Sequence, residues 1–96
     1  MMQFPTTNTF AAHLSLADAS VGEVFTVDKV IAPVDTPERA AQLEDIGFLA
    51  GERVSIMARG LPGGDPLVVR VGLSTFALRM VEAACVQVTP VETEAP

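Results

Sequence analysis

The sequence predicts a mainly β fold, a small and partly open barrel of about five short strands with one short α-helix. The chain has 96 residues, which allows a single domain. Hydrophobic residues make up 49%, and the aromatics are five Phe with no Trp or Tyr, so we expect an aliphatic core. Short runs rich in Val, Leu and Ile alternate with turns that contain Gly or Pro, which is typical of strands joined by tight loops.

The expected strands follow one another with short connections. Gly72 and Leu73 form a two-residue turn signal, so the runs on either side are expected to make a hairpin. Single helical turns are expected at residues 14–19, with Ser15 as a cap, and at residues 79–84. The strands are predicted at residues 23–31, 51–59, 67–71, 74–78 and 85–89.

The second of these strands shows the alternation of a half-buried strand. Val54, Ile56 and Ala58 are spaced two residues apart, so they should share one face of the sheet. Arg59 should then lie on the opposite face. Residues 60–66 contain three Gly and two Pro, which predicts a loop that leads to the next strand.

One α-helix is predicted with signals at both ends. Thr36 is expected as the N-cap, and Pro37 suits the first helical position because its missing N–H has no partner there. Gly47 is expected to end the helix in a left-handed conformation. That ending would bring Leu43 into contact with Phe48, as in a Schellman motif.

The domain organisation is a single folded unit with two extensions. We expect a folded domain at residues 14–89, a flexible arm at 1–13 and a disordered acidic tail at 90–96. Short strands, tight turns and one helix in so short a domain favour an SH3-like barrel, with an OB-like barrel as the alternative.

The acidic net charge argues against nucleic acid and anionic membranes as partners. The net charge is −6, and the six basic residues are spread singly along the chain. Nucleic acid and anionic membrane surfaces attract basic proteins, so neither is expected as a partner. A single cysteine excludes an intrachain disulfide, and no basic start of a signal peptide or long apolar run is present. A cytoplasmic location is therefore expected, without insertion into a membrane.

Six short sequence pieces occur in a fixed order over most of the folded domain. The pieces are LSLAD at 14–18, VGE at 21–23, IGF at 46–48, Gly51, GDPL at 64–67 and ALRMVEA at 77–83. Each piece alone is ordinary turn chemistry, whereas their order and spacing together are more specific. This order and spacing resemble those of the FeoA family of bacterial ferrous-iron transport proteins.

The resemblance implies an SH3-like fold and an accessory role in ferrous iron uptake. The implied partner is FeoB, the membrane iron transporter with a cytosolic G-protein-like domain, which would recruit this chain to the inner face of the membrane. The resemblance also leaves open an iron-responsive regulatory module of the SH3-like type. This chain lacks the DNA-binding helix pair that such a regulator would need.

A partner-binding surface is expected on aliphatic and Phe side chains. SH3 domains that bind Pro-rich peptides use a groove lined by Trp and Tyr, and this chain has neither. The Gly- and Pro-rich loop could serve either as a recognition loop or as a plain connection. Arg79 could belong to the partner surface, although a local ion pair or cap with Glu82 is the favoured interpretation. The candidate surface residues are Phe48, Leu49, Met57, Leu61, Pro62 and Arg79.

No cofactor or catalytic group is expected from the sequence. His13 is the only histidine and the first candidate for picking up Zn or Fe weakly, in particular between two chains of a homodimer. Cys85 is interpreted as a small buried side chain, because His13 is the only imidazole that could activate it. The chain is therefore expected not to be an enzyme, with a metal-binding or iron-delivery protein as the alternative to a docking module.

Overall fold

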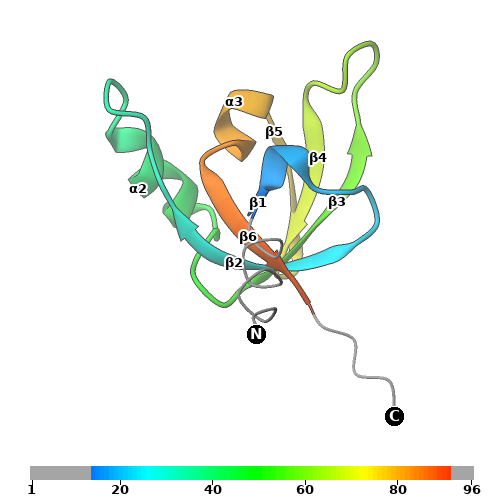
Figure 1. Ribbon diagram of the computed structural model, residues 1–96, viewed down its shortest axis with the longest axis horizontal. Coiled ribbons are helices and arrows are strands. Elements are labelled where there is room, and N and C mark those ends of the chain that lie inside the picture. Colours follow the sequence, from blue (N-terminus) through cyan, green and yellow to red (C-terminus); the bar gives the residue numbers. More distant parts are fainter. Residues whose placement is uncertain (1–13, 92–96) are drawn as a thin grey trace, which may run out of the picture.

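The computed structural model describes residues 14–91, and six antiparallel strands form its single sheet. The strand order is β1-β6-β2-β3-β4-β5, and the sheet curls into an open barrel (Figure 1). The mainly β prediction is confirmed. The elements are β1 (Leu14–Ser15), the 3₁₀ turn η1 (Leu16–Asp18), β2 (Val24–Val30), α2 (Glu38–Asp45), β3 (Arg53–Arg59), β4 (Leu67–Val71), β5 (Ser74–Leu78), α3 (Met80–Ala83) and β6 (Val86–Pro90).

The hairpin of β4 and β5 has the bounds that the sequence predicts. Val71 lies opposite Ser74, and the register continues without interruption to Leu67 opposite Leu78. Gly72 in the turn has φ of +58°, a left-handed conformation that glycine adopts without a steric penalty. The two-residue connection therefore explains both the turn and the register of this pair of strands.

A β-bulge in β3 overturns the expected position of Arg59. Ile56 lies opposite Val69, but Ala58 lies opposite Val68, so Met57 is an extra residue on this strand. The extra residue reverses the alternation, which leaves Ala58 exposed and puts Arg59 opposite the buried Leu67. Arg59 thus lies on the core side of the sheet, and the expectation that it lies on the opposite face from Ile56 is wrong.

The end of α2 has the predicted geometry, and its start does not. Gly47 has φ of +123°, and the N–H of Phe48 donates to the carbonyl of Leu43 at 3.1 Å, as in a Schellman motif. At the start, Pro37 occupies the capping position and no side chain caps the helix. Thr36 donates its hydroxyl to Asp35 instead, at 3.2 Å, so the prediction of Thr36 as N-cap is wrong.

The two ends of the domain lie side by side in the sheet. β1, which the sequence analysis included in a helical turn, pairs with β6, and the turn itself is reduced to η1. β6 continues to Pro90, opposite Phe25, and the N–H of Val91 bonds to the carbonyl of Val24. The strand β6 thus includes Pro90, the first residue of the predicted tail. The predicted arm at 1–13 and the rest of the tail at 92–96 lie outside the described residues.

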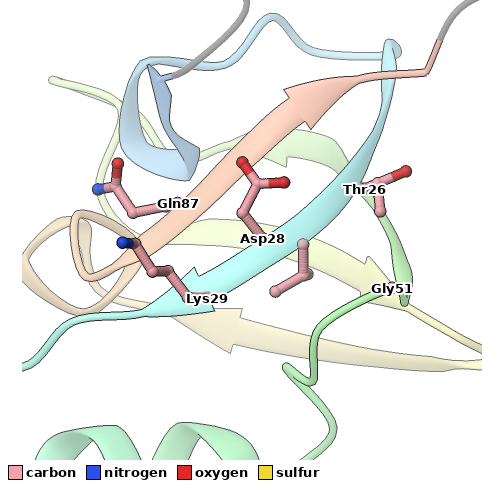
Figure 2. Close-up of a pocket in the computed structure, with 6 residues that line it drawn as sticks. Thr26, Asp28, Lys29, Gly51 and Gln87 are labelled. Atoms are coloured by element: carbon pink, nitrogen blue, oxygen red, sulfur yellow. The ribbon is translucent and has the colours of Figure 1, made fainter.

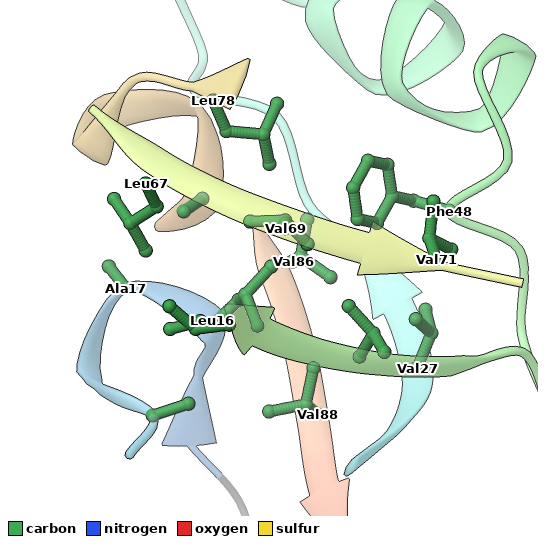
Figure 3. Packing of buried hydrophobic residues seen from close by; sticks show 14 of the residues in the cluster. Leu16, Ala17, Val27, Phe48, Leu67, Val69, Val71, Leu78, Val86 and Val88 are labelled. Carbon is green, nitrogen blue, oxygen red and sulfur yellow. The ribbon is translucent and has the colours of Figure 1, made fainter. Parts of the chain in front are cut away.

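The core is aliphatic, as expected, with two Phe side chains added. Phe25 and Phe48 are its largest members, and η1 contributes Leu16 to the same cluster (Figure 3). Among residues 14–91 no polar or charged residue is fully buried. A continuous apolar interior of this kind supplies the main driving force for folding. No helix in this part of the chain is long and apolar enough to span a membrane.

Candidate partner-binding surface

Arg59 connects three segments at one end of the barrel. Its Nη2 donates to the carbonyl oxygens of Ala17 at 2.8 Å and Ala19 at 2.9 Å, so it holds η1 against the end of β3. Its Nη1 lies 3.6 Å from the sulfur of Met80 in α3. Hydrogen bonds from a charged donor are stronger than neutral ones. This role could not be predicted, because the bulge that turns Arg59 inward has no signal in the alternating sequence pattern.

The loop of residues 60–66 is a compact structure that rests on this arginine. The N–H of Gly60 donates to the carbonyl of Pro66 at 2.8 Å, which closes the base of the loop. A Cβ on Gly60 would lie 2.7 Å from the carbonyl oxygen of Asp65, so only glycine fits there. The side chain of Leu61 is 94% exposed on this loop. A large apolar side chain is therefore exposed to solvent on a loop whose base is closed by a backbone hydrogen bond.

The same loop caps α3. The carboxylate of Asp65 accepts the N–H of Met80 at 3.0 Å, and the carboxylate of Glu82 accepts the N–H of Arg79 at 2.9 Å. Both carboxylates are at the positive end of the short helix. The favoured interpretation of Arg79 and Glu82 as a local cap is therefore supported, although the cap uses the backbone of Arg79 and not its guanidinium.

A surface hollow lies between the loop and the end of β5, beside the start of α3. It has a volume of about 320 Å³ and is lined by Asp65, Pro66, Ala77 and Arg79. Within residues 14–91 the guanidinium of Arg79 makes no hydrogen bond or ion pair, so it is available to a partner. We define the loop–α3 surface as Leu61, Pro62, Asp65, Pro66, Ala77 and Arg79.

The structure brings only some of the predicted surface residues together. Arg79 lines the hollow, and Leu61 and Pro62 lie on the loop that contributes Asp65 and Pro66 to it. Leu49 and Met57 are about half exposed, at 50% and 49%, and lie neither on this loop nor in the lining of the hollow. Phe48 is 0% exposed, so its expected place on a contact surface is wrong. The Schellman ending of α2 explains the burial, because it turns Phe48 inward beside Leu43.

A second, larger hollow of about 720 Å³ is lined by residues of β2 and β6 and by Gly51. Figure 2 shows Asp28 between Thr26 and Lys29 along β2, with Gln87 contributed by β6. The hydroxyl of Thr89 donates to the Asp28 carboxylate at 2.6 Å. This hollow holds one carboxylate and one amine, but no nucleophile with a base beside it.

The residues considered for metal binding and catalysis are not brought together. His13 lies outside the described residues. In the described part of the chain, no three His, Cys, Asp or Glu side chains gather as a metal site would require. Cys85 is 5% exposed, and its thiol donates to the carbonyl of Val81 at 3.5 Å. Its predicted role as a buried apolar side chain is confirmed.

Comparison with known proteins identifies similar sequences and structures. A family model described as the FeoA domain matches residues 14–90. A solved structure from Stenotrophomonas maltophilia is 36% identical and has a TM-score of 0.71, with coverage of 78% of this chain and 88% of that chain. That protein is described as FeoA complexed with zinc, an SH3 domain protein proposed to act as a ferrous iron transport activating factor. A comparison with curated proteins finds no match.

Two further structures show how widely the fold recurs. Iron(II) transport protein A from Clostridium thermocellum is 27% identical, with a TM-score of 0.68 over 81% of this chain and 46% of that chain. A manganese-dependent transcriptional repressor is 22% identical, with a TM-score of 0.69 over 82% of this chain and 42% of that chain, and shows the fold alone. The predicted SH3-like barrel is confirmed by these structural neighbours.

Proposed function

Because the chain belongs to the FeoA family of ferrous iron transport proteins, we propose that it is a cytosolic accessory protein that docks on a FeoB-like membrane transporter. It acts as a protein-interaction module without catalytic activity of its own. The docking surface is the loop–α3 surface, and the transporter contributes its cytosolic domain. Recruitment by the transporter brings the chain to the inner face of the membrane.

The observation that carries this proposal is the exposed position of Leu61 on a loop whose base is closed by the hydrogen bond between Gly60 and Pro66. Exposing a large apolar side chain to water is unfavourable, and a partner that covers it recovers that free energy. Function is often presented on loops that a rigid scaffold holds in place. The similarity to the S. maltophilia protein, described as a transport activating factor, supports a transporter as that partner.

Docking changes transport only through a difference in affinity between states of the transporter. If the chain binds one state more tightly than another, it shifts the population toward the favoured state. Equal affinity for all states would leave the equilibrium unchanged however tight the binding. The nucleotide dependence of binding therefore reports which state the chain recognises.

Calorimetry with the purified chain and the isolated cytosolic domain of its own organism's transporter tests the proposal. The titration is performed without nucleotide, with GDP and with a GTP analogue. We expect saturable binding whose affinity differs among these conditions. Absence of binding to the isolated domain, and again to the intact transporter in detergent, would exclude the docking function.

Weak binding of a transition metal is the second candidate, favoured by the zinc in the S. maltophilia structure. His13 would be the first ligand, and a single imidazole would require ligands from another molecule, such as a second copy of this chain. Titration with Zn²⁺ and Fe²⁺, combined with sedimentation analysis, tests this. Metal-dependent dimerisation that His13→Ala abolishes would support the candidate. If the His13→Ala variant binds Zn²⁺ and Fe²⁺ as the native chain does, His13 is excluded as the ligand.

A further inference from the structure

The edge of β5 has hydrogen-bonding groups that the sheet does not use. β5 is the last strand of the sheet and pairs with β4 alone. Since Val71 and Ser74 flank a two-residue turn, they form a hydrogen-bonded pair, as do Phe76 and Leu78 with their partners on β4. The N–H and C=O groups of Thr75 and Ala77 therefore point away from β4. No other segment in residues 14–91 makes a backbone hydrogen bond to them.

This edge also lacks the features that normally protect an exposed strand. Proteins prevent unwanted pairing at sheet edges with charged residues, proline, bulges or very short strands. β5 has five residues, Ser-Thr-Phe-Ala-Leu, without charge or proline, and its register with β4 is regular. An unprotected edge is the usual template for a bound peptide that adds to a sheet as a further strand.

The charges around β5 indicate the chemistry of the bound segment. Arg70 lies directly opposite Thr75 on the outer face, and its long side chain can extend over the short threonine. Arg53 lines the same shallow hollow of about 170 Å³ as Arg70, and Arg79 follows the end of β5. None of these three guanidinium groups makes an ion pair among the described residues. Carboxylates lie in the same region, since Asp65 and Glu82 are at the start of α3 beside Arg79, and Glu52 is at the Gly72 turn. The charge argument therefore depends on Arg70, which lies opposite Thr75 on the outer face.

We propose that β5 binds an extended, carboxylate-bearing segment of the partner protein as an added strand, an inference that rests on the proposed docking function. Backbone groups of the segment pair with Thr75 and Ala77, and its carboxylates meet Arg70 and Arg79. Ala77 and Arg79 also belong to the loop–α3 surface, so the two contacts are continuous. A second copy of this chain fits less well, because its β5 has no carboxylate to place beside Arg70.

The test uses the ¹⁵N-labelled full chain and two blocked pentapeptides that alternate Val with Glu or Val with Lys. We expect the Glu peptide to shift the amide signals of Thr75 and Ala77 and to slow their hydrogen exchange. Arg70→Glu should weaken this binding about fivefold, the upper range for an exposed ion pair. Arg39→Glu, the matched charge change on α2, should leave it unchanged.

Two further variants separate backbone pairing from charge. Thr75→Pro removes an outward N–H and should abolish binding, whereas Thr75→Val keeps that N–H and should bind like the native chain. Equal binding of the Glu and Lys peptides, shifts confined to another strand, or no binding of the Glu peptide at millimolar concentration would overturn the proposal. The peptide test contains no transporter, so it is independent of the calorimetry with the transporter's cytosolic domain. A chain that binds the Glu peptide but not the transporter would contradict the proposed function and not the added-strand proposal.

Discussion

At the scale of single residues, Arg59 has the largest structural role that the sequence conceals. It lies at the end of β3, yet it hydrogen-bonds to carbonyl groups about forty positions earlier in the chain, at Ala17 and Ala19. It also lies beneath the loop of residues 60–66, where its Cδ is 3.6 Å from the position of a Cβ on Gly64. The arginine thus links the start of the domain to the loop–α3 surface.

Arg59→Met is expected to lower the free energy of unfolding by about 2 kcal/mol, because two hydrogen bonds from a charged donor are lost while most of the apolar stem remains. Urea unfolding followed by circular dichroism measures this change. Arg53→Met is the matched control, since the Arg53 side chain makes no such bond among the described residues and should change stability by less than about 0.5 kcal/mol. Equal losses in the two variants would contradict the role assigned to Arg59.

At the scale of elements, the end of α2 depends on the backbone of Gly47. Its φ of +123° is unfavourable for a residue with a side chain. A Cβ there would lie 3.7 Å from Val71, which is ordinary contact, so the cost of a substitution comes from the backbone and not from a clash. Gly47→Ala should therefore lower the free energy of unfolding by at least about 1 kcal/mol.

Thermal unfolding compared between Gly47→Ala and Ala41→Gly measures this cost. Ala41 is exposed within α2, where glycine is less favourable by about 1 kcal/mol for reasons of helix propensity alone. Both variants should lose stability, although one replaces glycine with alanine and the other replaces alanine with glycine. A stabilised Gly47→Ala variant would mean that the left-handed conformation is not needed to end the helix.

The connection between the loop and α3 depends on a different side chain, Asp65. Asp65→Ala removes the acceptor for the N–H of Met80 and should cost about 1 kcal/mol of stability, as other N-terminal caps do. Hydrogen exchange at Met80 should also become faster. Asp45→Ala on the exposed face of α2 is the control and should leave that exchange rate unchanged. An unchanged rate in Asp65→Ala would exclude the cap.

At the scale of the whole molecule, features with a local cause could be predicted from the sequence. The β4–β5 hairpin follows from a two-residue turn between apolar runs, and the end of α2 follows from Gly47 and its neighbours. The buried state of Cys85 follows from its place before an apolar strand. In each case the residues that determine the structure lie within a few positions of one another.

Features that depend on distant partners could not be predicted. The bulge at Met57 and the pairing of β1 with β6 depend on segments that meet only in the folded sheet. Residue type predicts Leu61, Pro62 and Arg79 as surface residues, but it does not define the hollow beside them. Residue type alone also cannot show that Phe48 is buried, although the expected Schellman ending of the helix correctly predicts its contact with Leu43.

The proposal that the loop–α3 surface binds the transporter is tested most directly by substituting two exposed apolar residues, one on this surface and one away from it. Leu61 on the loop and Val34 between β2 and α2 are 94% and 99% exposed, so replacing either with Ser should leave stability nearly unchanged. The measurement is the affinity of each variant for the transporter's cytosolic domain. We expect Leu61→Ser to weaken binding at least about tenfold, as loss of a buried apolar contact would, and Val34→Ser to bind like the native chain. Equal affinity of the two variants would contradict the assignment of the docking surface to the loop and α3.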